Sequence, residues 1–260
     1  MALFEFELSP VEEILPWGEP GNQSLSWFAL TYGRFRMVVG EQTLFRYTDE
    51  ILSHWEMTEQ DADYQIAAFA RDLLGSVAAA VAPLPPTIER LASDWPRLME
   101  LKKPCDEKLE FDELWYQAWE WLGERSPSTP YLVACPKFQM VRIGTELRIH
   151  WDNREQVIDG IQVWTARQGV HVISVEAFLN ESRDFARRLL SEMHQRIVGL
   201  ETGTMKPQVE VSTSSLREQH ESWRAEFGSY FGEYRTDISW LETVKALQAI
   251  AEKKGLKLIT

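Results

Sequence analysis

The chain has 260 residues, which is enough for one large domain or two smaller ones and for a substantial buried core. Its 44% hydrophobic and 26% charged residues are close to the globular average and exclude a largely disordered chain, and no apolar run reaches the ~18 to 20 residues of a membrane span. The net charge of −13 excludes nucleic acid and anionic membranes as favoured partners, because a negative field repels both.

The first residues predict an antiparallel meander of strands. Residues 3–8 alternate apolar and acidic side chains, which is the pattern of a half-buried strand. Three further strand-like runs follow at residues 25–32, 34–39 and 43–47, with short breaks at Gly33 and at 40–42 that suit hairpins.

Helical periodicity replaces the strand pattern after residue 48. Apolar positions between 66 and 81 fall on one stripe, so we expect one continuous helix there. Shorter helices are expected over 87–100, where Pro96 lies inside or divides the helix, and over 107–122. A Pro/Ser/Thr connector at 126–130 then separates two proposed parts, 1–125 and 126–260, which form either two subdomains or one integrated domain.

The second part predicts hairpins followed by helices. Residues 138–143 and 146–151 flank a Gly-Thr turn, and residues 161–166 and 170–173 flank a second expected hairpin turn. Three helices are then expected, with starts marked by Ser174 and by capping boxes that begin at Ser215 and Ser239. We therefore predict an α+β fold, with antiparallel sheet elements from both halves packed against helices and a helical C-terminus.

The densest group of polar side chains lies between the two predicted hairpins. His150, Asp152, Arg154 and Asp159, with Trp164 close behind, would supply a general acid or base and an anion clamp. The competing interpretation is that the two acids are turn residues that hydrogen-bond to their own backbone. The five histidines show no metal-binding spacing, so the sequence predicts no metal site and no cofactor.

Aromatic residues are the other unusual feature. The chain contains 11 tryptophans, and Trp115 and Trp119 lie with other aromatics in a short helical segment interleaved with acids. Exposed aromatics mixed with acids would recognise a basic partner by cation–π and ionic contacts. The alternative is that they fill the space between a sheet and its helices.

Cysteine usage and motifs constrain the chemistry further. Cys105 and Cys135 form no disulfide framework, and the N-terminus carries Glu5 and Glu7 instead of the positive charges of an export signal, so we expect reduced thiols and a cytoplasmic protein. The sequence contains no nucleophile elbow and no glycine-rich phosphate loop. Whether the protein is an enzyme stays open, because catalytic residues also assemble from distant positions.

Several short runs of the sequence are distinctive: Trp17-Gly18-Glu19-Pro20, Ser24-Leu25-Ser26-Trp27-Phe28, Leu44-Phe45-Arg46-Tyr47, Trp121-Leu122-Gly123-Glu124-Arg125-Ser126, Trp151-Asp152-Asn153-Arg154 and Asp159-Gly160-Ile161-Gln162-Val163-Trp164-Thr165-Ala166 with Gly169. Together they resemble a bacterial domain family of unknown function. The similarity covers at least residues 3–200 and implies a bacterial source and one unit across the proposed boundary, without any catalytic residues to carry over.

The charge is concentrated in one half and favours an interaction protein. Residues 1–124 hold 23 acidic and 9 basic residues, with one acidic run from Asp49 to Asp63 that contains no Lys or Arg, whereas residues 125–260 hold 17 and 18. An acidic interaction protein of the immunity or antitoxin type, which binds a basic protein partner, fits this field. The alternative is an enzyme or small-molecule-binding protein with its site around His150, Asp152, Arg154 and Asp159. The same acidic surface would also serve solubility alone.

Overall fold

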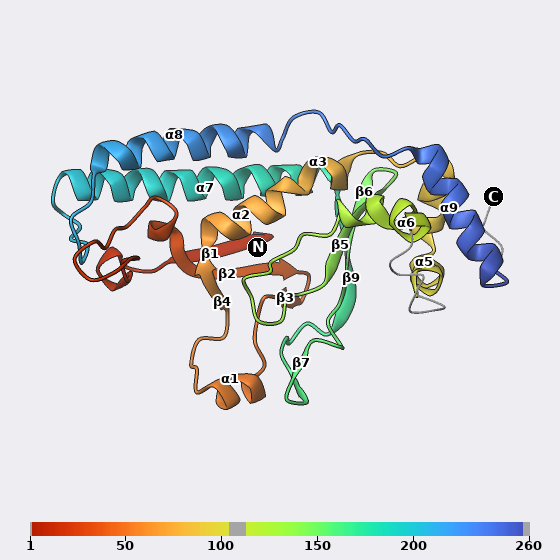
Figure 1. Ribbon diagram of the computed structural model, residues 1–260, viewed down its shortest axis with the longest axis horizontal. Coiled ribbons are helices and arrows are strands. Elements are labelled where there is room, and N and C mark those ends of the chain that lie inside the picture. The colour runs from red at the N-terminus through yellow and green to blue at the C-terminus, as the bar shows by residue number, and fades with distance from the viewer. Residues whose placement is uncertain (1, 104–112, 257–260) are drawn as a thin grey trace.

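The computed structural model of the protein describes residues 2–103 and 113–256 (Figure 1). It confirms the α+β class: antiparallel sheets from both halves of the chain pack against helices, and the described chain ends in a helix. Cys105 and the beginning of the helix predicted from residue 107 lie outside the described residues.

The first sheet is built around the long strand β2 (Tyr32–Val39). β1 (Phe4–Leu8) pairs with one edge of β2, and β3 (Gln42–Leu44) and β4 (Ala62–Gln65) share the other edge, all antiparallel. Alternate side chains of β2 are buried, as the period of a strand requires. The sheet therefore has one face in the core and one polar face.

The strand predicted over residues 25–32 is wrong. Only Tyr32 belongs to a strand, and Ala29–Thr31 form a 3₁₀ turn with all three side chains buried. β4 takes the place of that strand in the sheet, and its short sequence Ala-Asp-Tyr-Gln lacks the apolar run by which a strand is recognised.

The second sheet contains β5 (Phe138–Ile143), β6 (Glu146–Asp152) and β9 (Gln168–Ser174), in that order and antiparallel. The first predicted hairpin is confirmed, since β5 pairs with β6 and Gly144 takes a φ of +59° in the turn.

The second predicted hairpin is wrong. Strand β8 (Ile161–Gln162) pairs with β7 (Val157–Ile158), whereas β9 pairs with β6. The reason is burial: Val163, Trp164 and Ala166 all enter the core, so the chain leaves the ribbon instead of folding back on it.

Long helices cover the core face of the first sheet. In Figure 1, α7 and α8 run side by side along the top of the molecule; α7 contacts β1 of the first sheet directly, and α2 contacts β2 and β4. The helices are α1 (Asp49–Trp55), α2 (Ile66–Gly75), α3 (Val77–Val81), α4 (Pro86–Ser93), α5 (Trp95–Lys102), α6 (Glu113–Gly123), α7 (Val175–Glu201), α8 (Thr213–Ser229) and α9 (Trp240–Lys253).

The sequence predicts where the helices start more accurately than where they are interrupted. Ser174 and Ser239 cap α7 and α9 as predicted, whereas α8 begins at Thr213 behind Ser212 instead of at Ser215. The helix predicted over 66–81 is divided at Ser76, whose hydroxyl donates to the carbonyl of Asp72. Such a bond to the preceding turn bends helices, and it separates α2 from α3.

Two hydrophobic clusters support this arrangement. In the larger one, the ring of Phe185 on α7 lies 5.3 Å from Phe4 and 5.6 Å from Phe35, so residues of both proposed parts share one core. The smaller cluster joins α4, α5, α6 and α9 to β5. The boundary near residue 125 stays a prediction.

Within residues 2–103 and 113–256, no single helix has the length and apolar composition to cross a membrane. Only the sharply bent combination of residues 66–81 and 86–93 passes on both counts.

Candidate functional site

Two acidic segments that are distant in sequence meet on the side of the molecule opposite α7 and α8. We call residues 49–61 and 152–162 the acidic lobe; it contains α1, the loop after it and the β7–β8 ribbon, which both project below the first sheet in Figure 1. The two segments hold eight acidic residues against one arginine and one histidine. The lobe therefore combines an acidic run of the first half of the chain with three acids from the second half, whose net charge is close to zero.

Thr48 holds the two segments of the lobe together. Its hydroxyl donates to the carbonyl of Gln162 at 2.6 Å and accepts the amide of Ile51 at 3.3 Å, which caps α1. Its own amide donates to the carbonyl of Val163 at 3.0 Å. One residue thus starts the helix and attaches it to the end of the ribbon.

A ladder of aromatic rings supports α1 from inside. Trp55 of α1 contacts Tyr47 edge-on, with ring centroids 5.4 Å apart, and Tyr47 stacks on Trp164 with centroids 4.7 Å apart. Trp164 is 1% exposed, and its Nε1 donates to the carbonyl of Ala134 at 2.6 Å. Trp164, proposed from the sequence as a binding residue, is therefore a buried support of the lobe.

Asp159 lies in the tight turn of the ribbon. Asp159 and Gly160 have φ values of +51° and +79°, the two successive left-handed residues that a type I′ hairpin requires. The exposed carboxylate of Asp159 lies 3.1 Å from Nε2 of His54 on α1. Sequence reasoning did not select His54, because nothing local links residue 54 to residue 159.

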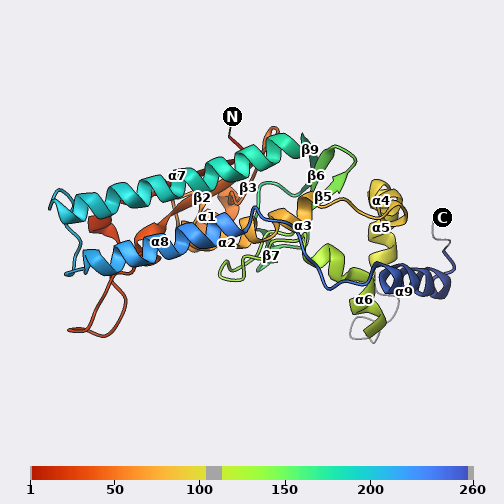
Figure 2. The same ribbon diagram turned by 90° about the horizontal axis from the view of Figure 1, so that it is seen from above.

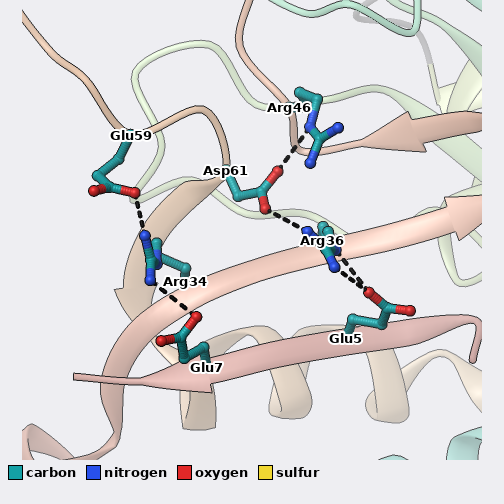
Figure 3. Close-up of polar contacts among 7 residues, drawn as sticks. All are labelled: Glu5, Glu7, Arg34, Arg36, Arg46, Glu59 and Asp61. Atoms are coloured by element: carbon teal, nitrogen blue, oxygen red, sulfur yellow. Dashed lines mark hydrogen bonds and ion pairs between the residues drawn. The ribbon is translucent and has the colours of Figure 1, made fainter. Parts of the chain in front are cut away.

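Three arginines neutralise the acids where the lobe joins the sheet (Figure 3). Arg34 of β2 bonds to Glu7 and Glu59, and Arg46 bonds to Asp61 at 2.9 Å. Arg36 joins Asp61 at 3.1 Å to Glu5 of β1. These outward-facing pairs connect β1, β2 and the loop before β4, and they leave little unbalanced charge at the base.

The acids at the far side of the lobe are differently placed. Glu50, Glu56 and Glu155 are exposed, and none of them forms an ion pair within the part of the chain that the structure describes. Asp49 and Glu50 occupy the first turn of α1, where the helix dipole favours negative charge. Val157 of the ribbon is half-exposed. The lobe thus carries exposed acids without ion-pair partners among the described residues, and also a half-exposed apolar side chain.

The structure does not bring the four predicted polar residues into one constellation. Arg154 bonds to Asp152 through Nε at 2.8 Å and Nη2 at 2.5 Å, and this hydrogen bond holds the pKa of Asp152 below its usual range. Asp159 contacts His54 instead. The pair and the turn belong to the acidic lobe, but they do not converge on a common point.

His150 lies apart, under helix α5. Its ring stacks on Trp95 with centroids 3.8 Å apart and planes 6° from parallel. Burial, with a smaller contribution from the nearby Arg148, lowers the pKa of His150 to about 4. At neutral pH this histidine is an uncharged packing residue.

Trp115 and Trp119 belong to the smaller hydrophobic cluster. Both side chains on α6 are buried, with ring centroids 5.7 Å apart. Their position agrees with the interpretation of aromatics as filling between layers. Among the described residues, no group of three or more His, Cys, Asp or Glu side chains is placed to hold a metal ion.

The fold and the site together define the class of protein. It is an α+β protein with an acidic surface site whose polar residues do not converge on one point. A model of a family of unknown function, DUF5984, matches residues 3–246, so the chain belongs to that family. No curated protein and no solved structure matches the chain. The resemblance inferred from the sequence to an uncharacterised domain family is thereby confirmed.

Proposed function

We propose that this protein is a bacterial cytoplasmic interaction protein of the immunity or antitoxin type, which binds a basic protein partner through its acidic lobe. The observation that carries the proposal is the convergence of residues 49–61 and 152–162 at one projecting end. Clustered surface charge of one sign steers association and raises the on-rate for a partner of opposite charge.

The form of the lobe supports recognition as well as steering. Its base is held by the arginine pairs of Figure 3 and by the aromatic ladder, so the exposed acids sit on a supported platform. The half-exposed Val157 adds an apolar side chain to the lobe. A fixed surface loses less conformational entropy on binding than a flexible one does.

A small-molecule site around His150, Asp152, Arg154 and Asp159 has less support. His150 is stacked under Trp95, and the three others are exposed residues that form two separate pairs or turns. Convergent groups in a concave site are what a ligand pocket requires.

The experiment compares two triple variants with the same change of charge. Glu50→Gln, Glu56→Gln and Glu155→Gln neutralise the lobe, whereas Glu12→Gln, Glu13→Gln and Glu19→Gln neutralise exposed acids outside it. The purified partner, isolated by cross-linking to the wild-type protein in its native cell, is tested by biolayer interferometry at several salt concentrations.

We expect the lobe variant to lower the on-rate about tenfold and the control variant to change it less than about twofold, with a wild-type on-rate that falls steeply as salt rises. Co-expression should also protect cells from the partner if it is a toxin. An on-rate that is flat with salt, or equal effects of the two variants, would contradict the proposal.

A further inference from the structure

A second charged region lies at the opposite side of the fold, between helices α7 and α8. The two helices run side by side (Figure 2) and enclose a cleft of about 700 Å³. Four arginines and two histidines line it: Arg183, Arg187 and His194 from α7, and Arg217, His220 and Arg224 from α8. Glu221 is the one carboxylate among the lining residues. On a chain with a net charge of −13, this local excess of positive charge is an exception.

The arginines of the cleft differ in how closely nearby carboxylates pair with them. Arg217 is held by two bonds to Glu201, at 2.6 and 2.5 Å, and Arg187 bonds to Asp184. Arg224 meets Glu221 only at 3.5 Å. Arg183 has no carboxylate partner among the described residues; its guanidinium lies 5.5 Å from the ring centre of Phe231. Arg183 and Arg224 therefore retain donors for an anion.

His220 is positioned in the cleft by a buried tryptophan. Nε1 of Trp27 donates to Nδ1 of His220 at 3.1 Å, so in the neutral ring Nε2 carries the proton. The ring of His194 lies 6.0 Å from that of His220. Since the Trp27 bond fixes the tautomer and the ring, His220 is a preorganised donor at the wall of the cleft.

The cleft also has an apolar side, formed by Leu190, Phe227 and Phe231. A volume of this size suits a small organic ligand, and such sites combine apolar walls with a few polar groups that fix orientation. Arginine forks match phosphate oxygens, and aromatic rings pack against flat apolar groups.

We propose that the α7–α8 cleft binds a small organic phosphate that carries a flat apolar or aromatic group. Arg183 and Arg224 bind the phosphate oxygens, His220 donates from Nε2, and Phe227 and Phe231 contact the apolar part. The ligand is a small molecule and not a nucleic acid, because the overall negative charge repels an extended polyanion outside the cleft. This inference is independent of the proposed function of the acidic lobe.

Isothermal titration calorimetry of the full chain with ATP, inorganic pyrophosphate and adenosine tests the proposal. The variant Arg183→Gln/Arg224→Gln removes both available guanidinium groups. Arg235→Gln is the matched control, since Arg235 is exposed outside the cleft and meets Glu233 at 3.6 Å, much as Arg224 meets Glu221. Thermal melts of all variants check that the fold is retained.

We expect ATP to bind more tightly than pyrophosphate and adenosine, and the double variant to weaken ATP binding at least about tenfold, whereas Arg235→Gln changes it less than about twofold. Absence of binding by millimolar ATP and pyrophosphate would overturn the proposal. So would ATP binding that the double variant leaves unchanged, or binding of a single-stranded oligonucleotide as tight as that of ATP.

Discussion

The acidic lobe and the α7–α8 cleft carry opposite charge on one chain and are built in different ways. The lobe consists of short elements, and five of its eight acids come from one acidic run, residues 49–61. The cleft lies between two long helices, and residues 183–231, which form it, hold seven acidic and seven basic residues. Segment charge therefore indicates one part of the lobe, but it does not reveal a site that helix packing assembles.

The two regions also differ in how their polar groups are supported. In the lobe, the supporting groups are aromatic rings and arginine pairs below an exposed surface. In the cleft, the supporting group is Trp27, which reaches the wall from the N-terminal part and holds one histidine. The lobe suits a broad protein contact, whereas the cleft suits a single small ligand.

The largest expected effect separates the supports of the two regions. Trp164→Ala should lower the free energy of unfolding by roughly 3 to 5 kcal/mol, because it removes a large buried ring and the bond to Ala134. Urea denaturation measures this value. Relative to the wild type, the rate of hydrogen exchange should increase more in α1 than in α7. Equal loosening of α1 and α7 would contradict a separate support for the lobe.

A smaller effect concerns the pH dependence of the cleft. Burial lowers the pKa of His220, and His194, Arg224 and Arg217 lower it further, whereas Glu221 raises it. Protonation of Nδ1 would break the bond that it accepts from Nε1 of Trp27, so this bond and burial both favour the neutral ring, which donates to the phosphate from Nε2. The contribution of His220 to affinity is then the same at every pH at which the ring stays neutral.

His220→Ala should therefore weaken ATP binding roughly threefold to tenfold, because the Nε2 donor is lost, and by a factor that changes little between about pH 8 and pH 7. Calorimetry of the wild type and the variant at both pH values measures this factor. A factor that rises steeply at the lower pH would show that the ring binds the phosphate as a cation.

The smallest expected effect concerns the turn of the lobe. Asp159→Ala should lower the free energy of unfolding by about 1 kcal/mol, because alanine is strained at a φ of +51° and the contact with His54 is lost. Asp152→Ala removes only the exposed ion pair with Arg154 and should change the free energy of unfolding by less than about 1 kcal/mol. Thermal melts compare the two, and an equal loss would show that backbone strain at Asp159 contributes little.

The candidate site was predictable in part. Asp152, Arg154 and Asp159 do lie in the lobe, and the base-free acidic run from Asp49 was visible. Their relation to His54 was not, because residues 54 and 159 meet only through the packing of α1 on the ribbon. The sequence shows Trp115 and Trp119 in one aromatic-rich segment and Trp164 close to the polar group, but the exposure of these rings depends on the layers that cover them.

The sequence by itself determined the α+β class, the β5–β6 hairpin, the caps at Ser174 and Ser239 and the acidic runs, because each depends on residues that are close along the chain. Only the tertiary structure decided that β9 pairs with β6, that β4 completes the first sheet and that four dispersed arginines share a cleft. These features depend on long-range contacts, in which burial of side chains such as Val163 and Trp164 outweighs the local turn preference.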